Sequence, residues 1–310
     1  MNQKNYLTID VIIPAFNAEI YIERTIFSIL TQTYPINRII IVNDGSNDLT
    51  LSMIQRIKTN INEPSKIEVH SKTNGGHASA VNFGIRLSDA DAIALIDSDD
   101  VWLPTKIEEQ VRVLQNNETI GLVYSDYNVI DDKDYLREDE TSRRVHPSLR
   151  GSVEHYLLLD GNKISGSNSA VLIRSKYLKK ELFDESLIAC EDWDLWIRLS
   201  RLTEFDFVPK QLVQIRRHGN NQSSQQLLML RSSLKVLVKH ISKLGLIDRR
   251  KALFRVLSSI GPKFYIFHIL TVSKLIWTYG FGLIEWLIFT LVVTPWNVLK
   301  KIYTFSKYHS

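Results

Sequence analysis

The stretch AIALIDSDDVWLP, residues 92–104, joins a short apolar run to a cluster of carboxylates. Residues 92–96 are small or aliphatic, which is typical of a buried strand, and the run ends at Asp97, Asp99 and Asp100. In an open α/β sheet, ligands bind beyond the carboxyl ends of the strands. The carboxylates therefore predict a divalent cation that holds a phosphorylated ligand.

The same carboxylates have a structural alternative. Asp99 and Asp100 could simply begin a helix over residues 103–114, with Pro104 in its first turn. The flanking sequence has to decide between the two interpretations.

Strand and helix patterns alternate along the first 100 residues. Apolar runs over residues 9–14, 38–43 and 92–96 predict buried strands, and residues 66–70 predict a weaker one; helical patterns over 18–31, 49–57 and 78–87 separate them. This alternation predicts an α/β, Rossmann-like fold with a mostly parallel central sheet and helices on both faces. No G-x-G-x-x-G follows the first strand and no P-loop sequence occurs, which disfavours dinucleotide oxidoreductases and P-loop enzymes.

Charge is distributed unevenly over the 310 residues. The net charge is +4, but residues 234–310 hold twelve Lys or Arg and two acids, so the preceding part is acidic. The single cysteine, Cys190, permits no internal disulfide, and the polar start lacks an apolar signal core. We therefore expect the protein to lie in the cytosol, at a membrane surface. We expect no nucleic-acid partner.

Four segments occur in order: VIIPAFN (11–17), IIVNDGSNDLT (40–50), NGGHASAVNFGI (74–85) and LIDSDDVWLP (95–104). Together they resemble the family 2 glycosyltransferases, which are inverting enzymes of GT-A fold that use nucleotide-sugars. The resemblance covers roughly residues 11–218, and four ordered motifs are more specific than an isolated Asp-x-Asp.

The resemblance implies a nucleotide-sugar site at the strand ends. Its expected residues are Pro14, Ala15, Asn17, Asp44, Asn74, Gly76, Asp97, Ser98 and Asp99. By the resemblance, Asp44 accepts a hydrogen bond from the base, and Asp99 binds Mn²⁺ or Mg²⁺ with Asp97 beside it. Val81 stands where many members carry arginine, so a phosphate contact is missing or supplied elsewhere.

A histidine near the end of the resemblance is a further candidate. Many relatives place a histidine here that closes over the metal or diphosphate, so His218 is a candidate metal ligand or phosphate donor. Arg216 and Arg217 could neutralise phosphate. His77 is a weaker candidate, because a lone histidine in a loop is usually only solvated.

The segment CEDWDLWIRL, residues 190–199, resembles the Glu-Asp element of the family at the start of a helix. An acceptor hydroxyl must lose its proton as it attacks, so a carboxylate is needed as general base. We predict Asp192 for this role, with Glu191 second. The alternative is that both are there because a helix N-terminus favours acids, and Cys190 is expected to be a small buried residue.

Two further segments carry expectations of their own. Residues 131–144 are so highly charged that we expect a solvated, mobile insertion, with acceptor contact as the alternative. Residues 264–303 are apolar and bracketed by aromatic and basic residues, which favours interfacial membrane helices over a single span or an oligomerisation surface.

These features together predict a GT-A domain over residues 1–222 and a basic, apolar helical region over residues 223–310. The donor half is 1–104 and the acceptor half 105–222. We expect a metal-dependent transferase that moves a sugar from a UDP-sugar to a glycan or lipid-linked glycan, at the cytoplasmic face of the cell membrane. Alternatives are transfer to a polyprenyl phosphate, a nucleotidyltransferase, and a non-catalytic sugar-nucleotide-binding or scaffold protein.

Overall fold

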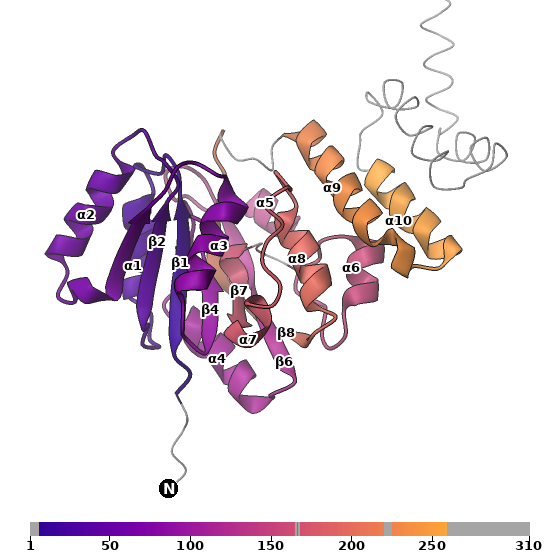
Figure 1. The fold of residues 1–310 in the computed structure, drawn as a ribbon, viewed down its shortest axis with the longest axis horizontal. Helices are drawn as coiled ribbons and strands as arrows, with labels where there is room; N and C mark the ends of the chain where they lie inside the picture. The colour runs from indigo at the N-terminus through magenta and orange to yellow at the C-terminus, as the bar shows by residue number, and fades with distance from the viewer. Residues whose placement is uncertain (1–5, 165, 167, 220–224, 259–310) are drawn as a thin grey trace, which may run out of the picture. The chain divides into compact units, whose positions relative to one another are not determined.

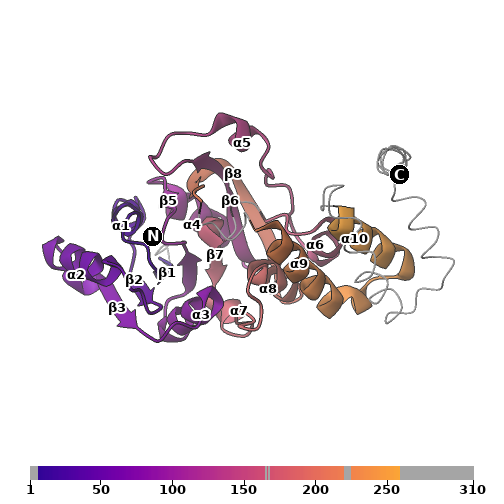
Figure 2. The same ribbon diagram turned by 90° about the horizontal axis from the view of Figure 1, so that it is seen from above.

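The computed structural model describes residues 6–164, 166, 168–219 and 225–258, and the chain divides into two compact units. The first unit runs to Ala252 and contains a single eight-stranded sheet (Figures 1 and 2). The second unit begins at Leu253, and most of it lies outside the described residues.

Strands and helices alternate through the first 116 residues. The described strands are β1 (Ile9–Ala15), β2 (Arg38–Asn43), β3 (Ile67–Ser71), β4 (Ala92–Leu95), β5 (Val101–Trp102), β6 (Ile120–Ile130), β7 (Val171–Arg174) and β8 (Glu204–Arg216). The described α-helices are α1 (Ile22–Leu30), α2 (Thr50–Asn60), α3 (His77–Leu87), α4 (Lys106–Asn116), α5 (Glu138–Ser142), α6 (Glu154–Asp160), α7 (Ser175–Leu178), α8 (Glu191–Leu199), α9 (Gln226–His240) and α10 (Leu246–Ser258). The strand predicted over residues 38–43 has the predicted bounds.

The sheet is mixed, with strand order β3-β2-β1-β4-β7-β6-β8-β5. β3, β2, β1 and β4 are parallel neighbours, and so are β6 and β8. β7 runs antiparallel to both β4 and β6, and β5 runs antiparallel to β8. The prediction of a mostly parallel sheet is confirmed, because six strands run in one direction and only β5 and β7 run against them. β7 runs the other way because the chain leaves β6 at one end of the sheet and enters β7 at that same end.

Helices cover both faces of the sheet, as predicted. Ile9, Val11 and Ile13 of β1 belong to a buried cluster with apolar residues of α1, α2 and α4. Ile12 faces the other way, toward α3, where a Cβ added at Gly84 would lie 2.6 Å from Ile12 Cγ2. The missing side chain at this position lets α3 lie close against β1.

Residues 131–144 form an anchored segment rather than the mobile insertion expected from their charge. Arg144 makes two hydrogen bonds to Asp126 of β6, from Nε at 2.8 Å and from Nη2 at 2.6 Å, and both side chains are buried. The Thr141 hydroxyl, from α5, accepts the N–H of Val129 at 3.0 Å. Most charged residues of the segment are exposed, and the buried Arg144 is tolerated because it pairs with Asp126, which anchors the segment beside β6.

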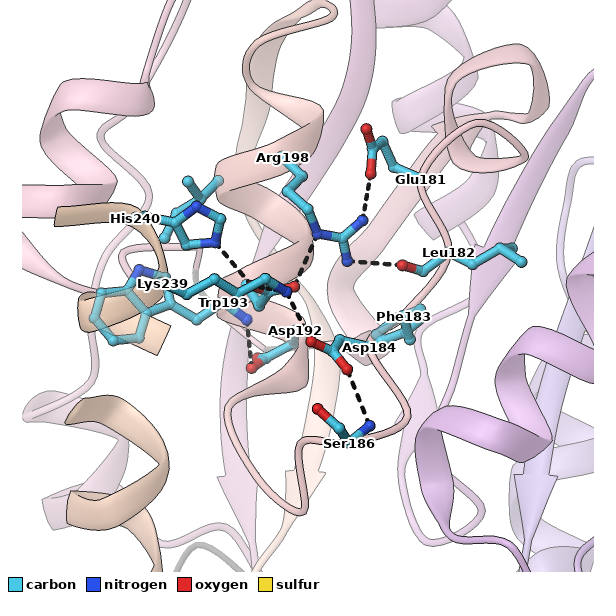
Figure 3. A network of polar contacts seen from close by, with 12 residues as sticks. Glu181, Leu182, Phe183, Asp184, Ser186, Asp192, Trp193, Arg198, Lys239 and His240 are labelled. Atoms are coloured by element: carbon cyan, nitrogen blue, oxygen red, sulfur yellow. Dashed lines mark hydrogen bonds and ion pairs between the residues drawn. The ribbon is translucent and has the colours of Figure 1, made fainter. Parts of the chain in front are cut away.

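A buried carboxylate joins α8 to α9 (Figure 3). Asp194 accepts hydrogen bonds or ion pairs from Arg198 Nε, Lys239 Nζ and His240 Nε2, each at 2.8 Å. Burial opposes ionisation of Asp194, but its bonds to His240 and Lys239 and the charge of Arg198 outweigh it, so its pKa lies well below the usual range. This network joins α9 to α8 within the first compact unit, which continues to Ala252; the functional boundary predicted at residue 222 stays a prediction.

Within the described residues, the helices are each too short or too polar to cross a bilayer. The predicted membrane segment, residues 264–303, lies outside the described part of the chain.

The first residue of α4 is a buried lysine. Lys106 is fully buried, and its ammonium nitrogen lies 3.3 Å from the carbonyl oxygen of Val171 and 3.9 Å from the ring centroid of Trp102. Burial lowers the pKa of Lys106 well below its usual value. Neither contact is an anion, so this lysine costs folding free energy when it is charged.

We expect the substitution Asp194→Asn to destabilise the protein by about 3 kcal/mol at pH 7, because it removes the buried carboxylate that Arg198, Lys239 and His240 share. The pKa of Asp194 is lowered by folding, so its contribution is complete above about pH 4 and is lost as the pH falls further. Chemical denaturation at pH 7 and pH 3 measures both effects. Asp89→Asn, at a side chain that is 92% exposed, is the control and should change little; equal effects of the two substitutions would contradict the prediction.

We expect Lys106→Met to stabilise the protein and to raise Tm by about 3 °C at pH 7, which corresponds to roughly 1 kcal/mol for a unit of this size. Methionine keeps the packing on Trp102 and removes the buried amine. Because folding lowers the pKa of this lysine, its cost shrinks as the pH rises toward the unfolded value of about 10.4. Thermal unfolding at pH 7 and pH 10 should therefore show a larger gain at pH 7. A loss of stability at pH 7 would refute this account, and Lys210→Met, at an exposed lysine, is the control.

Candidate active site

The carboxyl ends of β1 and β2 form the first side of the site. Pro14 and Ala15 are the last residues of β1 and pair with the last residues of β2. Asn17 follows in the left-handed region, with φ of 49°. Its N–H donates to Ser46 Oγ at 3.0 Å and its side-chain oxygen accepts the N–H of Asn47 at 2.9 Å. The predicted residues after β1 therefore lie against the turn after β2.

Asp44 joins this turn to the loop before α3. Its buried carboxylate accepts the N–H groups of Gly75 at 3.0 Å and Gly76 at 2.8 Å, and Lys72 Nζ at 2.6 Å. The predicted Asn74 lies beside it, because a Cβ added at Gly45 (φ 75°) would lie 2.9 Å from the backbone nitrogen of Asn74. The structure thus brings Asp44, Asn74 and Gly76 together. A nucleotide base that donates to Asp44 therefore binds a carboxylate that already accepts hydrogen bonds from Lys72, Gly75 and Gly76.

Asp100 is buried at the point where three strands end. It accepts hydrogen bonds from the Ser169 hydroxyl, just before β7, and from the backbone N–H of Arg216, at the end of β8, at 2.5 Å and 2.8 Å. Ser169 Oγ also accepts the N–H of Asp97 at 3.0 Å. Burial, and then the charges of Asp99 and Asp97, raise the pKa of Asp100 well above its usual value. Asp100 thus supports the turn over residues 97–100.

The structural alternative for this turn is wrong, because α4 begins at Lys106, well after Asp99 and Asp100. Asp97, Ser98 and Asp99 instead lie in the turn beyond β4, with partly exposed side chains.

Asp99 lies beside the predicted histidine. His218 Nε2 is 2.9 Å from Asp99 Oδ2. The imidazole stacks on Tyr21 with ring centroids 5.1 Å apart and an interplanar angle of 24°. Tyr21 also contacts Arg216, whose guanidinium carbon lies 4.7 Å from the centroid of the tyrosine ring. Tyr21 therefore fixes the position of His218 next to Asp99.

Arg216 does not neutralise phosphate in this arrangement, contrary to the prediction for it. The residue is 1% exposed, and its guanidinium donates to the carbonyl oxygens of Asp99 and Asp131 and to the Asp134 carboxylate. It therefore holds the segment 131–144 against the turn after β4.

The described residues contain no group of three His, Cys, Asp or Glu side chains close enough together to hold a metal ion by themselves. Asp99 and His218 form a pair, whereas Asp97 faces another histidine. Mg²⁺ and related ions commonly bind one or two carboxylates together with waters and substrate phosphates. A carboxylate and an imidazole that converge to 2.9 Å fit such a site for Mn²⁺.

His77 lies between the donor-side turn and α8. Its Nε2 is 3.0 Å from Asp97 Oδ1, and its Nδ1 is 3.0 Å from Glu191 Oε1. Burial disfavours the charged imidazole, but the hydrogen bonds to Asp97 and Glu191 outweigh it and raise the pKa of His77 well above its usual value. Residues that are far apart in the sequence thus meet through one side chain.

The two predicted catalytic carboxylates have different surroundings. Glu191 is 8% exposed and faces His77, whereas Asp192 is partly exposed. Asp192 accepts Asn162 Nδ2 at 2.8 Å and the N–H of Trp193 at 2.7 Å. A more accessible, hydrogen-bonded carboxylate in the first turn of α8 is suited to meet a substrate hydroxyl.

Cys190 precedes these residues in a left-handed conformation, with φ of 59°. Burial raises the pKa of its thiol to about 11, so the thiol stays protonated at neutral pH, as expected for a structural cysteine.

Sequence reasoning missed three supporting residues and made His77 only a weak candidate. Ser169, Tyr21 and Asn82 carry no local signal for their roles, because their partners lie far along the chain. His77 does carry a signal, its position directly after Gly76 in the third motif, but the sequence does not show which groups it faces.

Comparisons with known proteins agree with this geometry. The sequence profile described as Glycosyl transferase family 2 matches residues 10–182. An uncharacterized glycosyltransferase of Haemophilus influenzae is 32% identical over 71% of this chain and 69% of its own length. One of Rickettsia felis is 32% identical over 70% of this chain, which spans about a third (35%) of that relative. Hyaluronan synthase of Pasteurella multocida is 28% identical over 71% of this chain and 21% of its own length.

Solved structures share the fold. S. aureus TarS 1-349 in complex with UDP-GlcNAc aligns with a TM-score of 0.58 and 15% identity, covering 83% of this chain and 82% of that one. GalNAc-T7 with UDP, GalNAc and Mn²⁺ aligns with a TM-score of 0.55 and 16% identity, over 76% and 48% of the two chains. The fold is therefore of the GT-A type, and because the family profile matches more than half of its residues, the chain belongs to Glycosyl transferase family 2.

Proposed function

We propose that this protein is an inverting, metal-dependent glycosyltransferase that moves a sugar from a UDP-sugar to a hydroxyl group of a glycan or lipid-linked glycan. The observation that carries the proposal is the bridge through His77, whose two ring nitrogens lie 3.0 Å from Asp97 and 3.0 Å from Glu191. It brings the turn expected to hold the donor next to the helix that carries Asp192. A protein that only bound sugar nucleotides would not need this second group.

The donor half of the proposed mechanism uses the strand ends. Asp99 and His218 would hold the cation, with Asp97 beside them, and the cation would supply positive charge to the leaving diphosphate. Asp44, Asn74 and Gly76 surround the place proposed for the nucleoside. Lys72, bonded to Asp44, is a cation at this edge of the site and can interact with the donor where Val81 cannot.

The acceptor half uses Asp192 as general base. Its carboxylate takes the proton from the acceptor hydroxyl while that oxygen attacks the anomeric carbon, and the bond to the nucleoside diphosphate breaks in the same displacement. One displacement inverts the configuration of the anomeric carbon. Asn162 and the N–H of Trp193 hold the carboxylate in place as it acts.

The proposed donor, acceptor and location rest on the comparisons and on the sequence. The TarS structure contains UDP-GlcNAc and the GalNAc-T7 structure contains UDP and Mn²⁺, which supports UDP as the nucleotide. The hyaluronan synthase relative supports a glycan acceptor. The basic, apolar sequence over residues 264–303 supports a site at the cytoplasmic face of the membrane, where a lipid-linked acceptor would be met. A product consisting of a lipid-linked monosaccharide would instead identify a polyprenyl-phosphate transferase.

We expect UDP to bind in the presence of Mn²⁺ and to lose at least tenfold in affinity with chelator or with Asp99→Ala, because the diphosphate charge is then left without its counter-ion. Isothermal titration calorimetry on the full chain measures this. Asp89→Ala removes an exposed carboxylate outside the site and should bind as the wild type does.

Three results would contradict parts of the donor proposal. Binding of UDP that is unchanged in chelator would exclude metal dependence. Absence of UDP binding with metal, together with binding of GDP or dTDP, would correct the base, and absence of binding of all three would exclude a nucleotide-sugar donor.

We expect Asp192→Asn to lower kcat about 100-fold or more, which is the usual contribution of a general base, while the donor KM changes less than about threefold. The amide keeps the size and a hydrogen-bonding oxygen but takes no proton. Release of UDP from a UDP-sugar in the presence of acceptor measures both constants, with Asp89→Asn as the control. Full activity of Asp192→Asn would assign the base elsewhere, first to Glu191.

A further inference from the structure

His77 is the first residue of α3 and is fixed between carboxylates from two separate parts of the chain. Asp97 follows β4, and Glu191 begins α8. Each lies 3.0 Å from a different ring nitrogen. Nε2 is hydrogen-bonded to Asp97, whereas Nδ1 faces the Glu191 carboxylate at ion-pair distance without hydrogen-bond geometry, so each nitrogen faces a carboxylate from a different part of the chain.

The imidazole ring of His77 also packs against an aromatic side chain, that of Phe183. Phe183 meets it edge-on, with centroids 6.4 Å apart and an interplanar angle of 84°. Phe183 in turn meets Trp196 of α8 at 6.4 Å. Its backbone is bound by Asn82 of α3, whose Nδ2 donates to the Phe183 carbonyl at 2.9 Å and whose Oδ1 accepts the Phe183 N–H at 2.9 Å. The position of the imidazole is therefore set by both α3 and α8.

Glu191 is better explained by this contact than by catalysis. Its side chain is 10% exposed and lies against His77, while the neighbouring Asp192 has the more open position. A carboxylate that is already close to an imidazole is a poor candidate for taking a proton from a hydroxyl, but it is a good anchor for the start of a helix.

We propose that His77 is a positioning residue that, through Glu191, holds the first turn of α8 at a fixed distance from Asp97, so that the Asp192 carboxylate faces the anomeric carbon of the donor. This inference rests on the proposed transferase function. A displacement of about 1 Å at a reacting group can cost 100-fold in rate. Loss of His77 should therefore act on kcat, because Asp44 and Asp99 remain to bind the donor.

The kinetic test compares four forms of the full chain with the wild type: His77→Ala, His77→Gln, Glu191→Gln and the double variant His77→Ala/Glu191→Gln. We expect His77→Ala to lower kcat about 30-fold with less than a threefold change in donor KM. His77→Gln should recover part of the loss, since its amide can still donate to one carboxylate. The double variant should be no slower than His77→Ala, because both substitutions remove the same contact.

His70→Ala is the matched control. His70 lies in β3, with its ring 5.7 Å from that of Phe83, and it takes no part in the site. We expect its kcat and donor KM to equal those of the wild type.

A spectroscopic measurement tests the bridge even where a variant is unstable. With ¹⁵N-labelled histidine, and with the His77 signals assigned from His77→Gln, Glu191→Gln should shift the Nδ1 resonance and Asp97→Asn the Nε2 resonance. Absence of both shifts would overturn the bridge.

The other outcomes are distinct. A kcat of His77→Ala within twofold of the wild type, a loss confined to donor KM, or multiplicative losses in the double variant would overturn the inference while leaving the transferase intact. If the wild type transfers no sugar from any of the UDP-, GDP- or dTDP-sugars to any glycan acceptor, the proposed function fails, and the inference falls with it.

Discussion

The buried carboxylate of Asp100 is the constraint on which the arrangement of the site depends. It accepts hydrogen bonds from Ser169 and from the backbone of Arg216, so it ties together the chain at the ends of β4, β7 and β8. A carboxylate placed out of water has to be surrounded by donors, and here those donors come from strands with different directions. The turn that carries Asp97 and Asp99 is consequently stiff before any ligand arrives.

Much of the first half could be predicted from the sequence, because β1, β2 and β4 are largely apolar runs and the helices between the strands have apolar faces; β3 carries a weaker pattern. The reversal at β7 could not, since strand direction depends on where a long connection returns. The two-residue strand β5 is too short to leave a pattern. For segment 131–144 the expected solvation holds, because most of its residues are exposed, but its anchoring could not be predicted: Arg144 is buried because Asp126 of the preceding strand, β6, neutralises it.

The site shows the same division. The motifs that contain Asp99, His218 and Glu191 could be found from the residues, and the structure places the first two side by side. What the motifs do not reveal is which partners their side chains face. Arg216 was predicted as a phosphate ligand, but its guanidinium donates to backbone carbonyl oxygens. His77 was only a weak candidate, but its ring faces two carboxylates. Such roles depend on approaches between residues that share no local pattern.

The contact between Asn82 and Phe183 has a consequence for how this fold can diversify. The side-chain amide of Asn82 donates to the carbonyl of residue 183 and accepts its N–H. These are the two main-chain hydrogen bonds that a neighbouring strand would otherwise make. The two bonds to Phe183 involve only its main chain, whereas Asn82 Nδ2 also donates to the Glu185 carboxylate at 2.8 Å. Residues of the loop before α8 that make no such contact can therefore change, and with them the surface that the loop presents, while the distance between α3 and α8 is kept.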